Sequence, residues 1–498
     1  MNTDTKEFYA AIDMGSNSFH MVVAAYNDGQ LQIIDRIKEP VRFAAGLNDK
    51  GKLDEDAIQR ALRCLERFGQ RIREIPRVNI RAVGTNTLRQ ARNRKSFLRL
   101  ARSALGHPIE IISGREEARL TFHGVAHSVY SETDQRLVVD IGGGSTELII
   151  GKCFEPYYME SLYMGCVNIS QKYFKDGNVT NKQMRKAMLF AQQELESIQT
   201  AYKKKGWDTA IGSSGTILAV HSIVREKGWS ESGISSGSLK KLRANLIESG
   251  SFEDFDFEGL SDNRKAVFAG GVAILSAIFE ELEVKNMSVS DGAVREGLLY
   301  DLIGRTHQQD VRDQTIIDLG SRYKVDLEQA RRVEELLVSL FKQARKTWSL
   351  SSNPDLVLLK WAAHTHELGL SIAHAQYHKH GAYLLEHSDL PGFSNEEQLH
   401  LSMLVRAHRR KFPLLELEAI PEEDREHIIR LCLLFRLAVV LNRSRSYSSL
   451  PIPKLKIKEN RISLAFPDSW LQDHPLTQAD LETEASYIAK TKYRLVYS

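Results

Sequence analysis

The feature that most constrains this 498-residue chain is an apolar run that ends in an aspartate and leads into three glycines. The run begins at Leu137, Asp140 ends it, Gly142–Gly144 follow, and a second apolar run closes the stretch at Gly151. Two short apolar runs separated by glycines are typical of two buried strands joined by a tight turn. We expect the glycines to adopt positive φ and to let an anion reach several backbone N–H groups. The stretch therefore predicts a hairpin that binds phosphate.

Two carboxylates flank the predicted phosphate position in this hairpin, Asp140 and Glu147. Carboxylates repel phosphate unless a cation lies between them, and Mg²⁺ prefers one or two carboxylates together with phosphate oxygens and water. We therefore predict that Asp140 and Glu147 hold Mg²⁺. The residues predicted to bind phosphate are Gly142, Gly143, Gly144, Ser145 and Thr146. A single pattern of this kind would be equally compatible with a hairpin that binds no ligand.

The same pattern occurs again near the N-terminus. When Asp13 is aligned with Asp140, Gly15 matches Gly142, Ser18 matches Ser145, and His20 matches Glu147. Such internal similarity indicates two related half-domains, each with its own phosphate hairpin. The residues predicted to bind phosphate in the first hairpin are Gly15, Ser16, Asn17 and Ser18.

Short apolar segments followed by a small polar turn and a helix recur between and after the two hairpins. They lie at residues 79–83, 109–112, 209–211 and 287–289. Strands that alternate with helices predict an α/β fold whose ligands bind at the strand ends. Small polar residues at a helix start leave N–H groups free for an anion, so Ser214, Gly215 and Thr216 are further predicted phosphate ligands.

The motifs at residues 13–20, 84–89, 112–119, 140–147, 214–216 and 291–297 occur in an order that resembles the exopolyphosphatase / guanosine pentaphosphate phosphohydrolase family. The resemblance covers essentially the whole chain. It implies half-domains with the actin, Hsp70 and sugar-kinase fold, which is ribonuclease H-like. With the change to a mostly helical pattern after Arg305, we expect the following domains: actin-like half-domains at 1–123 and 124–309, an all-α HD-like domain at 310–445, and a small α+β domain at 446–498.

Histidines are concentrated in the helical region. They include His364, His366, His374, His378, His380 and His408. The region is similar to the HD phosphohydrolase domain, whose metal site needs a His-Asp pair and a later Asp. Here the pair is His366 and Glu367, and Asn442 stands at the later position. We therefore favour a helical scaffold whose histidines form hydrogen bonds or face an anionic substrate over a working metal centre.

Composition and charge limit the location and the partners. A formal net charge of +3 is small, and the four cysteines lack metal-binding or disulfide-framework spacing. The N-terminus has no secretory pattern and no apolar run is long enough to span a bilayer, so we expect a cytoplasmic protein without an integral membrane segment. No nucleic-acid-binding motif is present, and nucleic acid is therefore not an expected partner. The resemblance implies a homodimer and Mg²⁺.

Hydrolysis of a phosphoanhydride also needs a group that activates water. Glu116 and Glu117 are the candidates, and because neighbours on a helix point about 100° apart, only one can face the cleft well. The residues alone do not choose between them. In the resembled family the water-activating glutamate matches Glu117. Arg89 is a candidate guanidinium clamp on phosphate oxygens.

These features predict an exopolyphosphatase that releases orthophosphate from polyphosphate chains. The alternatives are a guanosine pentaphosphate 5′-phosphohydrolase, a kinase of the same fold group, and a nucleotide-sensing scaffold without activity. Three basic clusters favour a polymeric anion. They are the segment from Arg89 to Arg102, Lys203–Lys205, and the loop from His408 to Lys411.

Overall fold

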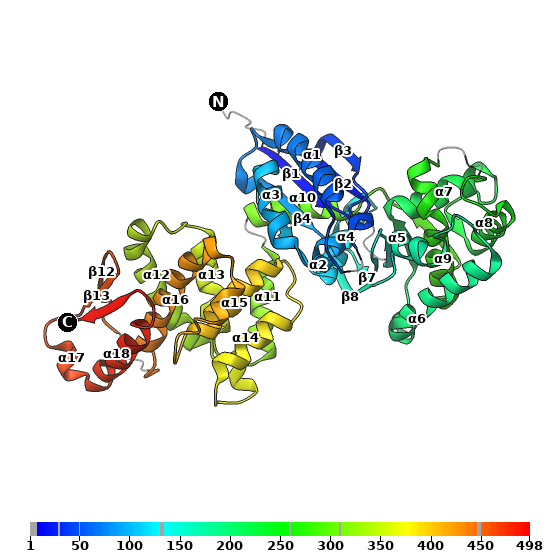
Figure 1. Ribbon diagram of the computed structural model, residues 1–498. Helices are drawn as coiled ribbons and strands as arrows, with labels where there is room; N and C mark the ends of the chain where they lie inside the picture. The colour runs from blue at the N-terminus through cyan, green and yellow to red at the C-terminus, as the bar shows by residue number, and fades with distance from the viewer. Residues whose placement is uncertain are drawn as a thin grey trace, which may run out of the picture. The chain divides into compact units, whose positions relative to one another are not determined.

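The computed structural model describes residues 7–27, 30–48, 50–129, 134–255, 257, 260–307, 310–445 and 450–498 (Figure 1). The chain forms two compact units, unit 1 (Met1–Asp310) and unit 2 (Val311–Ser498). In the described parts of the chain, no helix is both long and apolar enough to cross a membrane.

Unit 1 contains two sheets, of five and six strands, and five strands of the second follow the same order as those of the first. The first sheet has the order β3-β2-β1-β4-β5, and the second has β8-β7-β6-β9-β11-β10. In each sheet an antiparallel hairpin (β1 with β2, or β6 with β7) adjoins a parallel strand (β4 or β9). The strands are β1 (Glu7–Met14), β2 (Ser18–Asn27), β3 (Gln30–Pro40), β4 (Ile80–Gly84), β5 (Glu110–Ile111), β6 (Gln135–Ile141), β7 (Thr146–Lys152), β8 (Glu155–Leu162), β9 (Thr209–Ser213), β10 (Ile234–Ser235) and β11 (Asn286–Val289).

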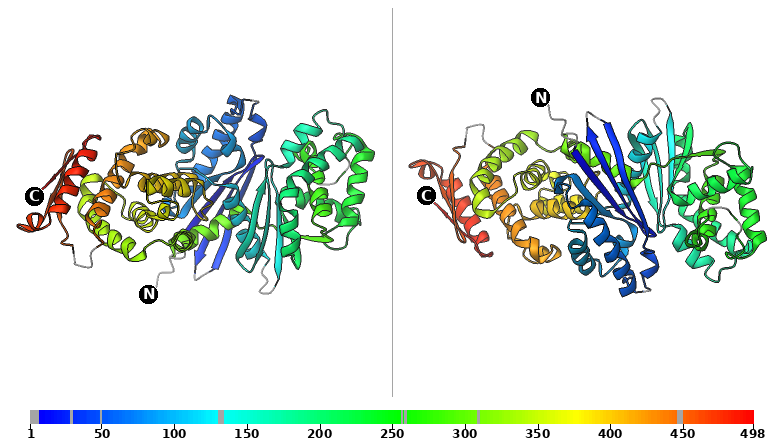
Figure 2. Two further views of the ribbon diagram at one scale, coloured as in Figure 1. Left: turned by 90° about the horizontal axis from the view of Figure 1, so that it is seen from below. Right: turned by 90° about the horizontal axis from the view of Figure 1, so that it is seen from above.

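The helices of unit 1 cover both faces of each sheet. They are α1 (Glu55–Ile72), α2 (Asn86–Gln90), α3 (Arg94–Leu105), α4 (Gly114–Ser128), α5 (Cys166–Tyr173), α6 (Asn181–Lys205), α7 (Ser214–Glu226), α8 (Ser236–Ser249), α9 (Asp262–Glu281) and α10 (Val294–Thr306). Side chains alternate between the faces of a strand, so Ala10 and Ile12 pack against α1 and α3 while Tyr9 and Ala11 pack against α10. Figure 2 shows α6 to α9, in green, on the side of the second sheet that faces away from the first.

The half-domains exchange a helix. Helix α4 follows the last strand of the first sheet in sequence, yet it packs on β6, β7 and β8 of the second sheet. Helix α10, from the end of unit 1, packs back on β1, β2 and β4, and α4 and α10 pack on each other. The expected boundary between residues 123 and 124 lies inside α4, because this helix continues to Ser128 to cover the apolar face formed by Val138 and Ile149.

Unit 2 is helical, with a small sheet at its end. Its elements are α11 (Val311–Arg322), α12 (Leu327–Trp348), α13 (Pro354–Thr365), α14 (Tyr377–His387), α15 (Asn395–Ala407), α16 (Glu422–Leu441), β12 (Lys454–Lys458), β13 (Arg461–Ala465), α17 (Trp470–Asp473), α18 (Pro475–Ile488) and β14 (Arg494–Tyr497). The expected boundary at residue 446 opens a stretch, 446–449, that lies outside the described residues. One hydrophobic core nevertheless joins α12 and α16 to β13 and α18, so the two expected domains are packed as a single body.

Candidate active site

The two predicted hairpins are present, and their registers agree with the sequence alignment. Asp140 lies directly opposite Glu147 on β6 and β7, and Asp13 lies directly opposite His20 on β1 and β2. In each sheet, the residues that lie directly opposite one another on neighbouring strands form a row across four strands. The row of the second sheet is Ser213, Asp140, Glu147 and Ser161, and that of the first sheet is Val83, Asp13, His20 and Lys38. Equivalent positions in the two half-domains therefore carry different chemical groups.

A cavity of ≈ 590 Å³ lies where the two hairpins meet in unit 1. The predicted site residues that line it are Gly15, Ser16, Asn17, Ser18, Glu117, Asp140, Gly142, Gly143, Gly144, Ser145, Glu147, Ser214, Gly215 and Thr216. Two of the predicted site residues, Thr146 and Arg89, do not line the cavity but bind groups next to it. Thr146 donates its hydroxyl hydrogen bond to the carbonyl of Met164, and Arg89 pairs with Glu117.

The hairpin glycines are needed for close approach rather than for an unusual backbone conformation. Positive φ was expected, but Gly15 and Gly142–Gly144 do not have it. A Cβ on Gly144 would lie 2.6 Å from Oδ1 of Asn86, and one on Gly143 would lie 3.0 Å from Cβ of Ser16. The second hairpin therefore lies directly against the first half-domain, and a side chain at either glycine would separate them.

Of the two neighbouring glutamates, only Glu117 faces the cavity, and each binds a different arginine. Ser113 caps α4 by accepting a hydrogen bond from the N–H of Glu116, and this places both carboxylates in the first helical turn. Glu116 turns away from the cavity and accepts two hydrogen bonds, of 2.7 and 2.8 Å, from the guanidinium of Arg119. Glu117 lines the cavity and accepts a 2.8 Å hydrogen bond from Arg89, which also donates to the carbonyl of Ile112 at 3.0 Å.

Four carboxylates meet at the floor of the cavity: Asp13, Glu117, Asp140 and Glu147. Burial, and after it the negative charge of Glu117, raises the pKa of Asp13 to about 8 and that of Asp140 to about 7. The same two causes raise the pKa of Glu147, although Ser161 donates a 2.8 Å hydrogen bond to it. Oδ1 of Asp13 is buried, and within the described ranges of the chain it has no hydrogen-bond partner. Burial and mutual repulsion of this kind are relieved when a cation is bound.

These residues fit a cation that keeps part of its shell of water and phosphate. Among the described residues, no three His, Cys, Asp or Glu side chains are grouped so that they could hold a metal ion by themselves. Mg²⁺ is commonly bound by one or two carboxylates plus phosphate oxygens and waters. The opposed pair Asp140 and Glu147 can supply those carboxylates.

The cavity wall also carries basic residues for which the sequence predicted no role: His20, Arg36, Lys38, Arg264 and Arg295. They come from β2, β3, α9 and α10, which are distant in sequence. Burial, followed by repulsion from Arg295, lowers the pKa of His20 to about 3. Burial and repulsion from Arg264 and Arg295 lower the pKa of Lys38 to about 8. The signals in the sequence were the alignment of His20 with Glu147 and the place of Arg295 inside the motif at residues 291–297.

Ser214 stands out among the residues at the start of α7. Its φ of 80° is uncommon for a residue with a side chain, and its buried Oγ has no hydrogen-bond partner among the residues that the structure describes. Such strained positions are concentrated at ligand sites. The predicted phosphate-binding role of Ser214 is compatible with this geometry.

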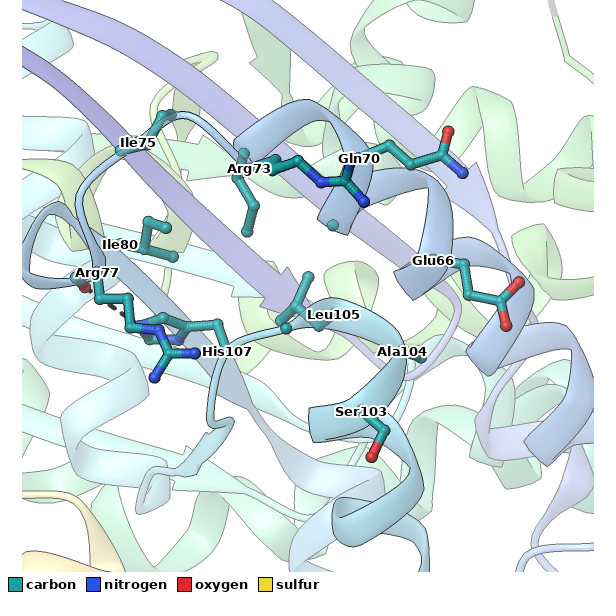
Figure 3. A pocket seen from close by; sticks show the side chains of 13 residues that line it. Glu66, Gln70, Arg73, Ile75, Arg77, Ile80, Ser103, Ala104, Leu105 and His107 are labelled. Carbon is teal, nitrogen blue, oxygen red and sulfur yellow. Dashed lines mark hydrogen bonds between the residues drawn. The ribbon is translucent and has the colours of Figure 1, made fainter.

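A second cavity, of ≈ 470 Å³, lies between the ends of α1 and α3 (Figure 3). Ile72, Ile80 and Leu105 line its floor, and His107 lies 3.2 Å from the carbonyl of Arg77. The residues that line it include none of the predicted site residues.

Two buried histidines of unit 2, His366 and His408, form hydrogen bonds with the helix backbone. Nδ1 of His366 donates to the carbonyl of Ala363 at 2.8 Å, and Nδ1 of His408 donates to that of Val405 at 2.6 Å. Glu367 pairs with Arg445, and the amide of Asn442 donates to the carbonyl of Ala438. This arrangement is compatible with the expected scaffold role, which stays a prediction.

Comparison with known proteins agrees with the ordered motifs. Residues 22–306 match the Ppx/GppA phosphatase family, and residues 311–485 match Ppx/GppA phosphatase, domain III. Relatives named guanosine-5'-triphosphate,3'-diphosphate pyrophosphatase occur in Vibrio cholerae (41% identical over 96% of this chain and 95% of the relative) and in Pseudoalteromonas translucida (38% identical over 99% and 98%).

Solved structures match the fold of unit 1. An Aquifex aeolicus member of the Ppx/GppA family is 28% identical, with a TM-score of 0.52 over 60% of this chain and 99% of that one. An exopolyphosphatase from Cytophaga hutchinsonii is 23% identical, with a TM-score of 0.55 over 60% and 98%. Unit 1 has the α/β, actin-like fold of these structures, and unit 2 corresponds to domain III. The chain therefore belongs to the Ppx/GppA phosphatase family, whose members hydrolyse phosphoanhydride bonds.

Proposed function

We propose that this enzyme is a guanosine pentaphosphate 5′-phosphohydrolase, which removes the terminal 5′-phosphate of guanosine 5′-triphosphate 3′-diphosphate. The observation that carries the proposal is the similarity, at 38–41% identity over nearly the full length, to relatives with that named activity. From the sequence alone, polyphosphate is the first expected substrate and guanosine pentaphosphate the second. The comparisons favour the reverse order, and a cavity with both an acidic floor and a basic wall suits a substrate with many phosphates.

In the proposed mechanism Glu117 is the general base. A water molecule in the cavity would give its proton to Glu117 as its oxygen attacks the terminal phosphorus, and the diphosphate would leave on the opposite side. Arg89 holds the Glu117 carboxylate in place through their 2.8 Å hydrogen bond, as a positioning residue for the base. The backbone N–H groups of the two hairpins would bind the phosphate oxygens. Mg²⁺, held by Asp140 and Glu147, would neutralise charge on the phosphates.

Inorganic polyphosphate is the second candidate substrate. The segment from residue 86 to residue 108 contains six Arg and Lys residues and no acidic residue. Lys95, Arg99 and Arg102 follow i, i+4, i+7 spacing and therefore lie along one face of α3, whose buried face carries Phe97, Ala101 and Leu105. A polyanion chain could bind along this face. A homodimer and a cytoplasmic location are also part of the proposal, on the strength of the family resemblance.

Phosphate release from guanosine pentaphosphate, long-chain polyphosphate and ATP, each titrated with Mg²⁺, tests this proposal. We expect the highest kcat/KM with guanosine pentaphosphate and no turnover without a divalent cation. A preference for long-chain polyphosphate would instead make the enzyme an exopolyphosphatase. Transfer of phosphate from ATP to an acceptor other than water would contradict hydrolysis altogether.

A further inference from the structure

The second cavity lies at the opposite end of the first sheet from the hairpin loops. Its lining includes Ile80, the first residue of β4, whereas Gly84, the last residue of β4, is paired with Met14 at the start of the hairpin turn. A strand rises about 3.3 Å per residue, so the two ends of β4 are about 13 Å apart. Among the described residues, none lines both the second cavity and the cavity at the hairpins. A molecule bound in the second cavity is therefore separate from one bound at the hairpins.

The loops that follow α1 and α3 hold the second cavity in shape. His107, after α3, is buried, and its Nδ1 and Nε2 lie 2.8 Å from the carbonyl of Pro108 and 3.2 Å from that of Arg77. Asn79, just before β4, donates a 3.2 Å hydrogen bond to the carbonyl of Phe8 on β1. These contacts connect the loop after α1 to the end of α3 and to the sheet. The volume of ≈ 470 Å³ is within the range of small-molecule sites.

Charged side chains border the second cavity at its rim. Arg73 and Arg77 line it and are exposed, and in the described ranges of the chain neither has an ion pair. Figure 3 shows Arg77 beside His107 at one end of the cavity and Glu66 at the other. Arg73 follows Glu66 by seven residues and keeps helical backbone angles after the last residue of α1, so both side chains lie on one face of the helix, about 10 Å apart. The rim therefore has a place for an anion beside the arginines and one for a hydrogen-bond donor beside Glu66.

Carbonyl oxygens at the end of α3 add hydrogen-bond acceptors to the wall of the second cavity. The last carbonyls of a helix have no intrahelical partner and carry partial negative charge. A Cβ on Gly69 of α1 would lie 2.7 Å from the carbonyl oxygen of Leu105 and 2.9 Å from that of Ala104, so a side chain at this position would cover them. The floor is apolar, with Ile72, Ile80 and Leu105. The second cavity thus combines hydrogen-bond acceptors with a surface for a flat apolar group.

We propose that the second cavity binds a purine mononucleotide. Arg73 and Arg77 bind its phosphate, since guanidinium groups match phosphate geometry. Glu66 and the carbonyls at the end of α3 accept hydrogen bonds from the N–H groups of the base, and the apolar floor packs against its ring. An inorganic anion would leave the apolar floor uncovered, and a fatty acid would leave the acceptors unpaired. Guanine suits Glu66 best, because its ring N–H and its amino group together match the two oxygens of a carboxylate. This site goes beyond the proposed function and does not rest on it.

Hydrogen exchange measured with and without GMP tests this site without turnover. We expect GMP to slow exchange in the peptides that cover residues 66–80 and 101–107. Arg77→Gln should raise the GMP concentration needed for half of this protection by about 10-fold or more, because a charge-assisted hydrogen bond is lost. Protection of the hairpin peptides, at residues 13–20 and 140–147, should not change in this variant. Arg71→Gln is the matched control, because Arg71 is an exposed residue of α1 that does not line the second cavity.

Guanosine and inorganic phosphate test the two parts of the ligand separately. Guanosine should protect the same peptides more weakly than GMP does, and Arg77→Gln should not alter its effect. Inorganic phosphate that protects as well as GMP would overturn the nucleotide in favour of a plain anion. GMP that leaves these peptides unprotected, or that protects them equally in the wild type and in Arg77→Gln, would overturn the site. Because no step needs turnover, an enzyme inactive on guanosine pentaphosphate would contradict the proposed function and leave this test intact.

Discussion

Two adjacent glutamates show how packing gives different surroundings to the same residue type. Glu116 is 2% exposed and bound to Arg119, whereas Glu117 faces the cavity and is bound to Arg89. A buried carboxylate with a bidentate arginine is fixed and has no access to water. The carboxylate that lines the cavity is the one that can take a proton from a bound water.

We predict that Glu117→Gln lowers kcat by at least ~10²-fold, the scale of a lost general base, while substrate still binds. The amide keeps the shape of the side chain and can still contact Arg89, but it is not basic. Single-turnover kinetics and equilibrium binding of guanosine pentaphosphate would measure the two effects separately.

Glu116→Gln is a poor control for this experiment, because it breaks a buried ion pair. Glu74→Gln, at an exposed position after α1, is a better one. Turnover close to that of the wild type in Glu117→Gln would remove Glu117 from the mechanism.

At the scale of elements, a buried ion network fixes the crossing of α4 and α10. Asp301 of α10 accepts hydrogen bonds from Arg81 of β4 at 2.6 Å and from Arg305 at 2.8 Å, and it also pairs with Arg119 of α4. Arg81 in turn donates to Glu110 of β5 at 3.1 Å. Three arginines face three carboxylates, since Glu116 completes the set, and the side chains of Arg81, Arg119, Glu116 and Asp301 are 5% exposed or less. The network therefore connects the first sheet to the two exchanged helices, one of which carries Glu117 and the other Arg295.

We predict that Asp301→Asn destabilises unit 1 by roughly 3–5 kcal/mol, because it leaves buried arginines without their shared carboxylate. Urea unfolding followed by hydrogen exchange of unit 1 peptides would measure the loss. The matched control is Asp56→Asn, an exposed position in the first turn of α1, where we expect a change within about 0.5 kcal/mol. Equal stability of the two variants would show that the network contributes little.

At the scale of the whole molecule, the two units concentrate different kinds of titratable groups in their interiors. Unit 1 buries carboxylates at its cavity, and unit 2 buries His366, His378 and His408 close together, with ring centroids 5.4 Å apart for the first and third and 6.1 Å for the second and third. Burial lowers the pKa of His366 and of His378 to about 4, and burial lowers that of His408, which also lies beside His366 and would be repelled by it if both were protonated. These imidazoles are therefore neutral in the folded unit at neutral pH.

We predict that unit 2 loses stability as the pH falls from about 6.5 toward 4. In this range the unfolded chain binds protons that the folded unit does not, so protonation favours unfolding. His366 alone accounts for about 3 kcal/mol over the range, at about 1.4 kcal/mol per pH unit. Hydrogen exchange of unit 2 peptides in urea at pH 7 and pH 5 would measure the effect.

His366→Asn should reduce this pH dependence, and His374→Gln, at an exposed position, should leave it unchanged. Equal stability of unit 2 at pH 5 and pH 7 would contradict the prediction and would indicate that a bound cation or a water compensates the histidines.

The sequence by itself determined the local parts of this protein. The aspartate, glycine and hydroxyl pattern is sufficient to locate both hairpins, and residues that align between them, such as Asp13 and Asp140, occupy equivalent places in the two strand registers. The helix starts at Asp54 and Ser113 depend on side-chain caps that lie within three residues of the N–H they bind. The order of the motifs was sufficient to indicate the family. These features follow from interactions between residues that are close in the chain.

Only the tertiary structure decided which of these residues share the cavity and how they face it. The rotation of α4, which separates Glu116 from Glu117, depends on packing against β7, β8 and α10. The basic wall combines β2, β3, α9 and α10, and no local pattern connects them. The glycines are required by the approach of the two half-domains rather than by their own φ. Contacts between distant segments, each with its own burial and charge, are what a local sequence pattern does not contain.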